Sequence, residues 1–440
     1  MTAVAVFGFL IALELAVRHY GMPGPITTQA REVLWPPKSG GLLYASMALM
    51  MVVLTWRQRF LALGAAIGID AVFGLVRWAA GIGLGGGHPF GNGALWVILG
   101  CTGLAVTRRT GPERLLLLKG VGLALILMAG RKTGDAWLYL TSMTRPMVLD
   151  QYVATADHAL GNPSWIAGRL VTASGSIGFN VLDFVYGQLP VAAVVVALYQ
   201  LRHVATERRF PRHHLVRTFL TIGLIGPAFY LIFPVVGPVF AYGTGAEHWE
   251  GVSLWAPHMP ASAPWAVADL WPHTPSPLSP PHLMPFDEIT PRNCMPSLHT
   301  AWATAIFIHS RKGPRALRWA GTFWLVATLA ATLGFGYHYG VDLIAGVVFT
   351  LTIEGALRAH DRNWDRSGIQ LVAHGSTVFA ALLLSYRWLP VQMAAHPWLA
   401  GPLLLLAMGS VIHSYVRTTT SWEPGPAPAP KPSAPQPELI

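Results

Sequence analysis

The stretch GYHYGVDLIAGVVFTLTIEGAL, residues 336–357, joins a long apolar run to a histidine and an aspartate at its beginning. The run from Gly340 to Leu357 is long enough to cross a bilayer core, which takes roughly 17–25 residues. His338 and Asp342 stand four residues apart and therefore share one helix face. The stretch predicts a membrane helix with titratable groups at one end.

The composition of the whole chain indicates the same environment. Hydrophobic residues make up 53% of the 440 residues and charged residues only 11%, whereas a soluble domain has about 25% charged residues. Two cysteines, Cys101 and Cys294, are too few for a disulfide framework, and neither has a second cysteine nearby that would suggest a metal site. These features exclude a cytosolic enzyme, a disulfide scaffold and a disordered hub.

The apolar runs predict an all-α fold, a polytopic membrane bundle of about 12 spans. The candidate spans lie near residues 2–19, 41–56, 60–80, 90–107, 115–130, 181–201, 218–239, 297–310, 319–338, 340–357, 369–388 and 397–414.

The segments between these spans predict a division of the chain into parts. We expect N-terminal membrane helices in 1–130, an extracytoplasmic amphipathic segment at 131–180, a core in 181–357 with a Pro- and Trp-rich outer loop at 240–296, C-terminal helices in 358–422 and a disordered tail at 423–440.

Basic residues gather on one side of the predicted spans. Of the 30 Lys and Arg residues, 19 stand in loops, or in the C-terminal tail, that the alternation of spans puts on the same side. Because basic loops stay in the cytoplasm, we expect both termini there and residues 131–180 and 240–296 outside. The net charge of +10 therefore reflects topology, and no basic stripe indicates nucleic acid.

A second polar segment, NCMPSLHT at residues 293–300, precedes another span on the outer side. Proline is favoured at the first position of a helix, so we expect the helix to begin at Pro296. The backbone N–H groups of Ser297, Leu298 and His299 would then face outward beside a hydroxyl group. A helix beginning of this kind is suited to bind a phosphate oxygen.

The first polar segment offers a nucleophile to the same side of the membrane. Asp342 can accept the proton of one imidazole nitrogen of His338 and leave the other nitrogen free to attack. Each histidine alone is more typical of an anchor at the membrane interface. Both together, on consecutive spans and with His299 beside a predicted anion site, favour catalysis.

The segments Pro296–Thr300 and His338–Asp342 together resemble the paired signature of the phosphatidic-acid phosphatase type 2 superfamily. They look most like the branch of inositol phosphorylceramide synthases and their bacterial relatives. The resemblance implies a six-helix core in the C-terminal half and an inositolphosphotransferase-like enzyme.

The resemblance also implies roles for the three candidate catalytic residues. His338 would attack phosphorus and form a phosphohistidine, Asp342 would orient it, and His299 would protonate the leaving oxygen. The donor would be a lipid phosphate or phospholipid and the acceptor water or an alcohol, including a lipid alcohol. Neither a metal nor another cofactor is implied.

Departures from the family pattern affect the phosphate-binding residues. The phosphatase branches carry a Lys and an Arg-Pro seven residues apart, and here Lys132 and Arg145 are thirteen apart. Those branches also have an Arg where this chain has Thr332, which favours the transferase-like branch, as does Leu298. The candidate phosphate-binding residues are Ser297, Arg292, Arg145 and Lys132.

The sequence thus predicts an integral, multi-pass lipid phosphotransferase or phosphatase with an extracytoplasmic active site, in what we expect to be a bacterial inner membrane. Two alternatives remain open: a transporter or flippase of lipid-linked phosphates with the histidines as a proton relay, or a non-catalytic scaffold that binds lipid phosphate. The motifs do not separate hydrolysis from transfer or identify the lipid.

Overall fold

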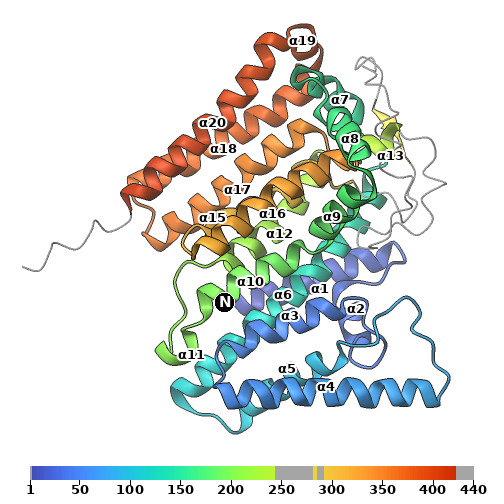
Figure 1. Cartoon of the computed structure of the whole chain (residues 1–440), viewed down its shortest axis with the longest axis vertical. Coiled ribbons are helices and arrows are strands. Elements are labelled where there is room, and N and C mark those ends of the chain that lie inside the picture. The colour runs from blue at the N-terminus through green and yellow to red at the C-terminus, as the bar shows by residue number, and fades with distance from the viewer. Residues whose placement is uncertain (1, 243–280, 285–291, 423–440) are drawn as a thin grey trace, which may run out of the picture.

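The computed structural model describes residues 2–242, 281–284 and 292–422 (Figure 1). Within them the fold is all-helical, as expected, apart from two short strands. Strand β1 (Met147–Val148) pairs antiparallel with β2 (His282–Leu283). Most of the predicted loop 240–296 and the tail 423–440 lie outside the described residues.

Seven helical segments in the described part are long and apolar enough to cross a membrane, which makes this a multi-pass membrane protein. They are α4 (Trp56–Ala79), α10 (Leu189–Leu201) continued by α11 (Val204–Glu207), α12 (Leu215–Ile232), α16 (Arg315–Gly334), α17 (Gly340–Asp361), α18 (Arg366–Trp388) and α20 (Pro397–Ser421).

The other expected spans fall on helices outside this set, so the count of about 12 stays a prediction. These helices are α1 (Thr2–His19), α3 (Gly40–Met51), α5 (Asn92–Thr107), α6 (Gly111–Thr144) and α15 (Leu298–Ser310). Shorter helices are α2 (Pro25–Arg31), α13 (Pro238–Tyr242) and α19 (Pro390–Ala395).

The amphipathic segment expected to start at residue 131 instead begins inside a continuous helix. Helix α6 runs on to Thr144 because its polar residues find partners: Lys132 pairs with Glu32, and Arg131 pairs with Asp135. Short elements follow, namely β1, α7 (Asp150–Asp157), a 3-10 turn (His158–Leu160), α8 (Pro163–Ala173) and α9 (Gly175–Gly187).

The described helices share two large apolar cores. Residues of α3, α5 and α6 form one core together with Ala197 and Leu201 of α10 and Val216 of α12. The other core lies among α7, α12, α15, α17, α18 and α20. In Figure 1, α4 and α5 lie along one edge of the molecule and α18 and α20 along the opposite edge.

Helices α15 and α17 approach closely where both begin. The N–H of Ser297 donates to the carbonyl of Asp342, 3.3 Å away. A Cβ on Gly346 would stand 2.6 Å from the carbonyl oxygen of Ser297, so only glycine fits this contact. This contact brings the two sequence motifs side by side.

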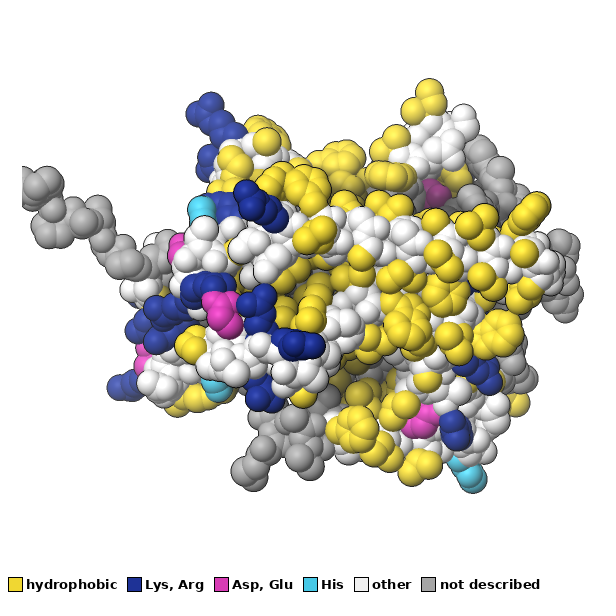
Figure 2. Space-filling view, turned by 90° about the horizontal axis from the view of Figure 1, so that it is seen from below, with side chains coloured by type: hydrophobic (Ala, Val, Ile, Leu, Met, Phe, Trp, Pro, Cys, Tyr) yellow, Lys and Arg dark blue, Asp and Glu magenta, His cyan; other side chains and the backbone are white. Residues whose placement is uncertain are grey.

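The bundle has two chemically different ends. We call the end that carries His338 and Asp342 the site end, and the opposite end, where Arg217 pairs with Asp361 and Arg208 pairs with Glu113, the basic end. Figure 2 shows that most of the Lys and Arg side chains visible on this face gather at the left of the view, beside a broad apolar surface.

Candidate active site

His338 and Asp342 meet at the beginning of α17. The Nδ1 atom of His338 lies 3.3 Å from Oδ2 of Asp342, which also accepts the backbone N–H of Tyr339 at 2.9 Å. Both side chains are buried, at 2% and 0% exposed. The hydroxyl of Ser164 donates to the carbonyl of His338 at 2.6 Å and fixes the backbone there. Because Nδ1 faces the carboxylate, Nε2 of His338 is the candidate reacting atom.

Burial also sets the charge of this imidazole. Loss of solvent lowers the pKa of His338 below its ordinary value of 6.5, although a hydrogen bond to the backbone of Cys294 acts in the opposite direction. A neutral ring keeps a lone pair on one nitrogen, which a nucleophile requires.

His299 lies in the first turn of α15 and faces the same region. Its ring centroid is 6.4 Å from that of His338, with the two rings inclined by 64°. Tyr186 of α9 stacks on His299 at 4.2 Å, and its hydroxyl lies 3.1 Å from Nδ1. Tyr186 therefore both packs and orients the second imidazole.

The beginning of α15 differs from the sequence expectation in one respect. The helix starts at Leu298 with Ser297 as its N-cap, so Pro296 stands before the helix. The Ser297 hydroxyl accepts the N–H of Thr300 at 3.3 Å, and its own N–H donates to α17. Hence the Ser297 N–H, expected to face outward, is already used.

Two aspartates of α7 reach the same end of α17, and the sequence motifs did not identify them. Asp150 accepts the N–H groups of Val236 and Gly237 at 3.0 and 2.8 Å and the hydroxyl of Tyr339 at 2.9 Å. Asp157 accepts the N–H of Val341 at 3.0 Å. Burial raises the pKa of Asp150 to about 6 and that of Asp157 to about 8.

The three basic residues expected to bind phosphate occupy different places. Lys132 lies in a buried ion pair with Glu32, 2.7 Å long, against α2. Arg292 is fully buried and donates from Nε to the carbonyl of Arg145 at 2.9 Å and from Nη2 to that of Met284. Arg145 is exposed and lines a cavity together with Arg387.

Within the described residues, two groups of side chains have the residue types of a metal site. Cys294, His338 and Asp342 bring their ligand atoms within 4.8 Å of one another at the site end. The thiol of Cys294, however, donates to the carbonyl of Tyr337 at 2.9 Å, so here it acts as a hydrogen-bond donor.

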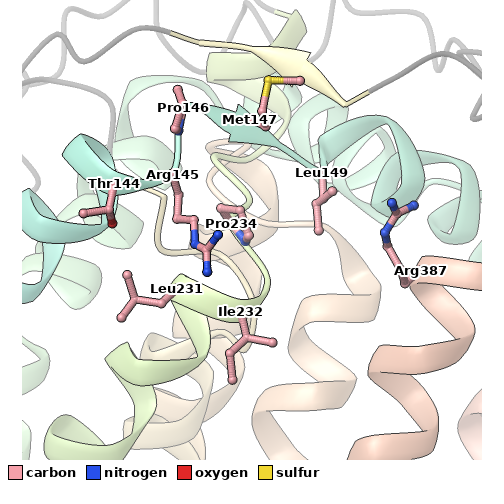
Figure 3. Close-up of a pocket in the computed structure, with 9 residues that line it drawn as sticks. All are labelled: Thr144, Arg145, Pro146, Met147, Leu149, Leu231, Ile232, Pro234 and Arg387. Atoms are coloured by element: carbon pink, nitrogen blue, oxygen red, sulfur yellow. The ribbon is translucent and has the colours of Figure 1, made fainter.

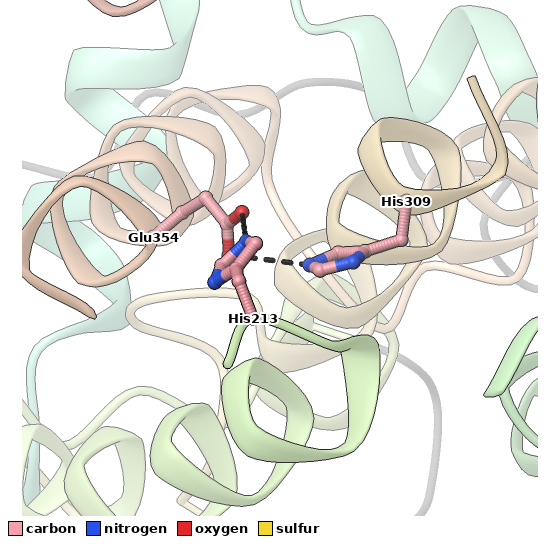
Figure 4. Close-up of side chains that lie close together, drawn as sticks. All are labelled: His213, His309 and Glu354. Atoms are coloured by element: carbon pink, nitrogen blue, oxygen red, sulfur yellow. Dashed lines mark hydrogen bonds and ion pairs between the residues drawn. The ribbon is translucent and has the colours of Figure 1, made fainter. Parts of the chain in front are cut away.

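The second group, His213, His309 and Glu354, lies at the basic end (Figure 4). Gln200 accepts the N–H of Leu215 through its oxygen and turns its NH₂ toward Nδ1 of His309, 3.0 Å away. Nδ1 is therefore the acceptor, and Nε2 carries the proton and faces Glu354 at 3.3 Å.

Further groups donate hydrogen bonds to the carboxylate of Glu354. Nε2 of His213 lies 2.5 Å from Glu354, the hydroxyl of Thr218 donates at 2.5 Å, and Nε of Arg358 lies at 3.2 Å. A carboxylate with this many donors and a guanidinium partner is an ion-pair centre that joins α12, α15 and α17. Its hydrogen bonds do not suit metal ligation.

Comparison with known families matches two parts of the chain. Residues 151–355 match the model described as PAP2 superfamily, which is the superfamily that the two motifs resemble. Residues 1–140 match a domain of unknown function, DUF5933. No curated protein and no solved structure matches the chain. The PAP2 match covers both histidine motifs and Asp157, and it begins one residue after Asp150.

Proposed function

We propose that this protein is a membrane lipid phosphoesterase, a phosphotransferase or phosphatase, that works through a phosphohistidine. The observation that carries the proposal is the pair of buried imidazoles whose ring centroids lie 6.4 Å apart, one of them oriented by Asp342. The match of residues 151–355 to the PAP2 superfamily supports a reaction at a lipid phosphate.

The proposed reaction has two balanced steps. Nε2 of His338 attacks phosphorus, the N–P bond forms, the P–O bond to the leaving group breaks, and protonated His299 gives its proton to the leaving oxygen. An acceptor hydroxyl then attacks phosphorus, the N–P bond breaks, and His299 takes the acceptor's proton. Asp342 stabilises the imidazolium character that develops on His338.

The charge distribution supports an extracytoplasmic site. Because basic loops stay in the cytoplasm, the basic end is the cytoplasmic end in this proposal, and His299 and His338 face the other side. Leu298 and Thr332 favour transfer to an alcohol in the manner of the inositol phosphorylceramide synthase-like branch. Arg292 then shapes the site through backbone carbonyls, and Ser297 positions α15.

Purified protein, offered labelled phosphatidate and labelled phosphatidylinositol with and without a lipid alcohol, tests the proposal. We expect labelled product from the wild type and a loss of at least about a hundredfold in His338→Ala and His299→Ala, since each removes a reacting group. His374→Ala on α18 is the matched control and should keep wild-type activity.

The acid stability of the label that stays bound to the protein identifies the intermediate. An acid-labile phosphoramidate on His338 is expected in wild-type protein that is quenched after brief exposure to substrate, and none in His338→Ala. Product formation by the His338→Ala variant would show that His338 is not the nucleophile. Movement of intact lipid across the membrane without bond cleavage would favour the transporter alternative.

A further inference from the structure

A cavity of about 300 Å³ lies at the site end, apart from the two histidines. Its walls come from the end of α6 and β1, the end of α12 and the last turn of α18 (Figure 3). None of His299, His338 and Asp342 lines it. The cavity is therefore a place where a second molecule can bind.

The charged groups of this cavity are all of one sign. Arg145 and Arg387 line it, and no carboxylate does. Within the described residues, neither guanidinium has a hydrogen-bond or ion-pair partner, although Arg387 lies over the rings of Tyr152 and Trp388, at 4.1 and 5.0 Å. Each guanidinium carries five N–H donors arranged for planar oxyanions. Such a pair favours an anionic occupant.

Apart from Thr144, the other side chains that line the cavity are apolar. Figure 3 shows Leu231 and Ile232 below the two arginines. Both belong to the last turn of the apolar helix α12, and Ile232 is 68% exposed. An occupant that fits both parts has an anionic head beside the arginines and an apolar body along α12.

We propose that this cavity binds the headgroup phosphate of an anionic phospholipid, as a site separate from the reacting phosphate. A guanidinium binds phosphate through two parallel N–H donors, and the apolar side along Ile232 selects a lipid over a free ion. The proposal concerns binding and stands whether or not the histidines catalyse a reaction.

The cavity and the histidine site share one segment of chain. Pro234 lines the cavity, and its carbonyl accepts the N–H of Leu149 at 2.8 Å. Two residues further on, Val236 and Gly237 donate to Asp150, which also holds Tyr339 beside His338. A bound lipid would therefore stabilise the backbone that supports the histidine site.

Native mass spectrometry of the full-length protein in mixed micelles of phosphatidylglycerol and phosphatidylcholine tests the proposal. We expect retained phosphatidylglycerol in the wild type and about tenfold less in the Arg145→Gln/Arg387→Gln double variant, since charge-assisted hydrogen bonds are lost. Arg169→Gln is the matched control: Arg169 is exposed and lies over Trp165 at 5.4 Å, much as Arg387 lies over Trp388.

Two further variants locate the bound lipid. Arg387→Lys keeps the positive charge but lacks the planar N–H donors of the guanidinium. It should retain an amount of phosphatidylglycerol between those of the wild type and the double variant, and it provides a test if the double variant fails to fold. His338→Ala should retain lipid normally, and loss of lipid there would place the lipid at the histidine site and overturn the proposal. Displacement by millimolar inorganic phosphate, or equal retention in the double variant, would also overturn it.

Discussion

At the scale of single residues, Tyr186 links a helix outside the two motifs to the proposed chemistry. Its ring stacks on His299 and its hydroxyl lies 3.1 Å from Nδ1. Tyr186→Phe keeps the stack and removes the hydrogen bond, which contributes about 1 kcal/mol. We expect kcat to fall by roughly fivefold and the melting temperature by no more than a few degrees, measured by lipid-phosphate turnover and thermal unfolding.

The control for this prediction separates orientation from packing. Tyr186→Ala also removes the stacked ring and should lower both kcat and the melting temperature. If Tyr186→Phe had the same kcat and pH–rate profile as the wild type, the hydroxyl would have no part in orienting His299.

Asp157 gives a prediction about pH. Burial raises the pKa of its carboxyl to about 8 from the ordinary 3.8, so between about pH 4 and pH 8 the folded protein holds a proton that the unfolded chain releases. Stability from this group is therefore full at low pH and falls as the pH rises to about 8.

Asp157→Asn removes this ionisation, while its side-chain oxygen can still accept the N–H of Val341. We expect the melting temperature of the variant, relative to the wild type, to increase between about pH 5 and pH 8. Thermal unfolding in one detergent across this range measures the difference. A constant difference would show that the pKa of Asp157 is not raised in the folded protein.

The site residues that were predictable from sequence are those that carry local motifs. His299, His338 and Asp342 stand beside Pro, Ser or Gly at helix beginnings, and the structure brings their elements together. Tyr186 and Asp157 reach the site only through the packing of α9 and α7, and no local pattern marks them. Lys132 looked like a phosphate ligand because its partner Glu32 is 100 residues away.

At the scale of elements, the caps of α15 and α18 offer a matched comparison. Ser297 accepts the N–H of Thr300 at 3.3 Å, and Asp365 accepts that of Gly368 at 2.8 Å. Replacing either cap by alanine should cost about 1 kcal/mol of unfolding free energy. Only Ser297→Ala should also lower turnover, because α15 carries His299.

Denaturant unfolding and turnover of the two variants measure this difference. If Asp365→Ala lost as much activity as Ser297→Ala, the lower stability of each variant would be enough to explain its loss of turnover. Equal turnover in Ser297→Ala and the wild type would mean that the α15 cap does not position His299.

Helix positions were more predictable from sequence than helix ends. The apolar runs of α4, α12, α17 and α18 are continuous, and hydropathy alone indicates them. The continuation of α6 past residue 130 depends on tertiary ion pairs such as that of Lys132 with Glu32. Hydropathy does not contain that information.

At the scale of the whole molecule, the two ends should differ in their access to solvent on either side of the membrane. Met147 lies at the site end, 39% exposed, and Arg315 is the exposed first residue of α16. In a background without Cys101 and Cys294, we expect Met147→Cys to react with an impermeant maleimide on intact cells. Arg315→Cys should react only after permeabilisation.

Mass-tag labelling before and after permeabilisation measures both sites in parallel. The reverse pattern would invert the proposed topology and move the histidine site to the cytoplasmic face. Reaction of both cysteines from one side would contradict the odd number of spans, three, that is predicted between them.

The length of α15 has a consequence for how a lipid reaches the site. Its 13 residues extend about 20 Å, whereas the hydrocarbon core of a bilayer is about 30 Å thick. If α15 crosses the membrane as proposed, with Arg311 and Lys312 among the cytoplasmic headgroups, its first turn with His299 would lie below the level of the opposite headgroups. In that arrangement the bilayer would thin or the protein would admit water there. A phosphate can then meet the histidines at the depth of the glycerol backbone, so its acyl chains need not leave the membrane.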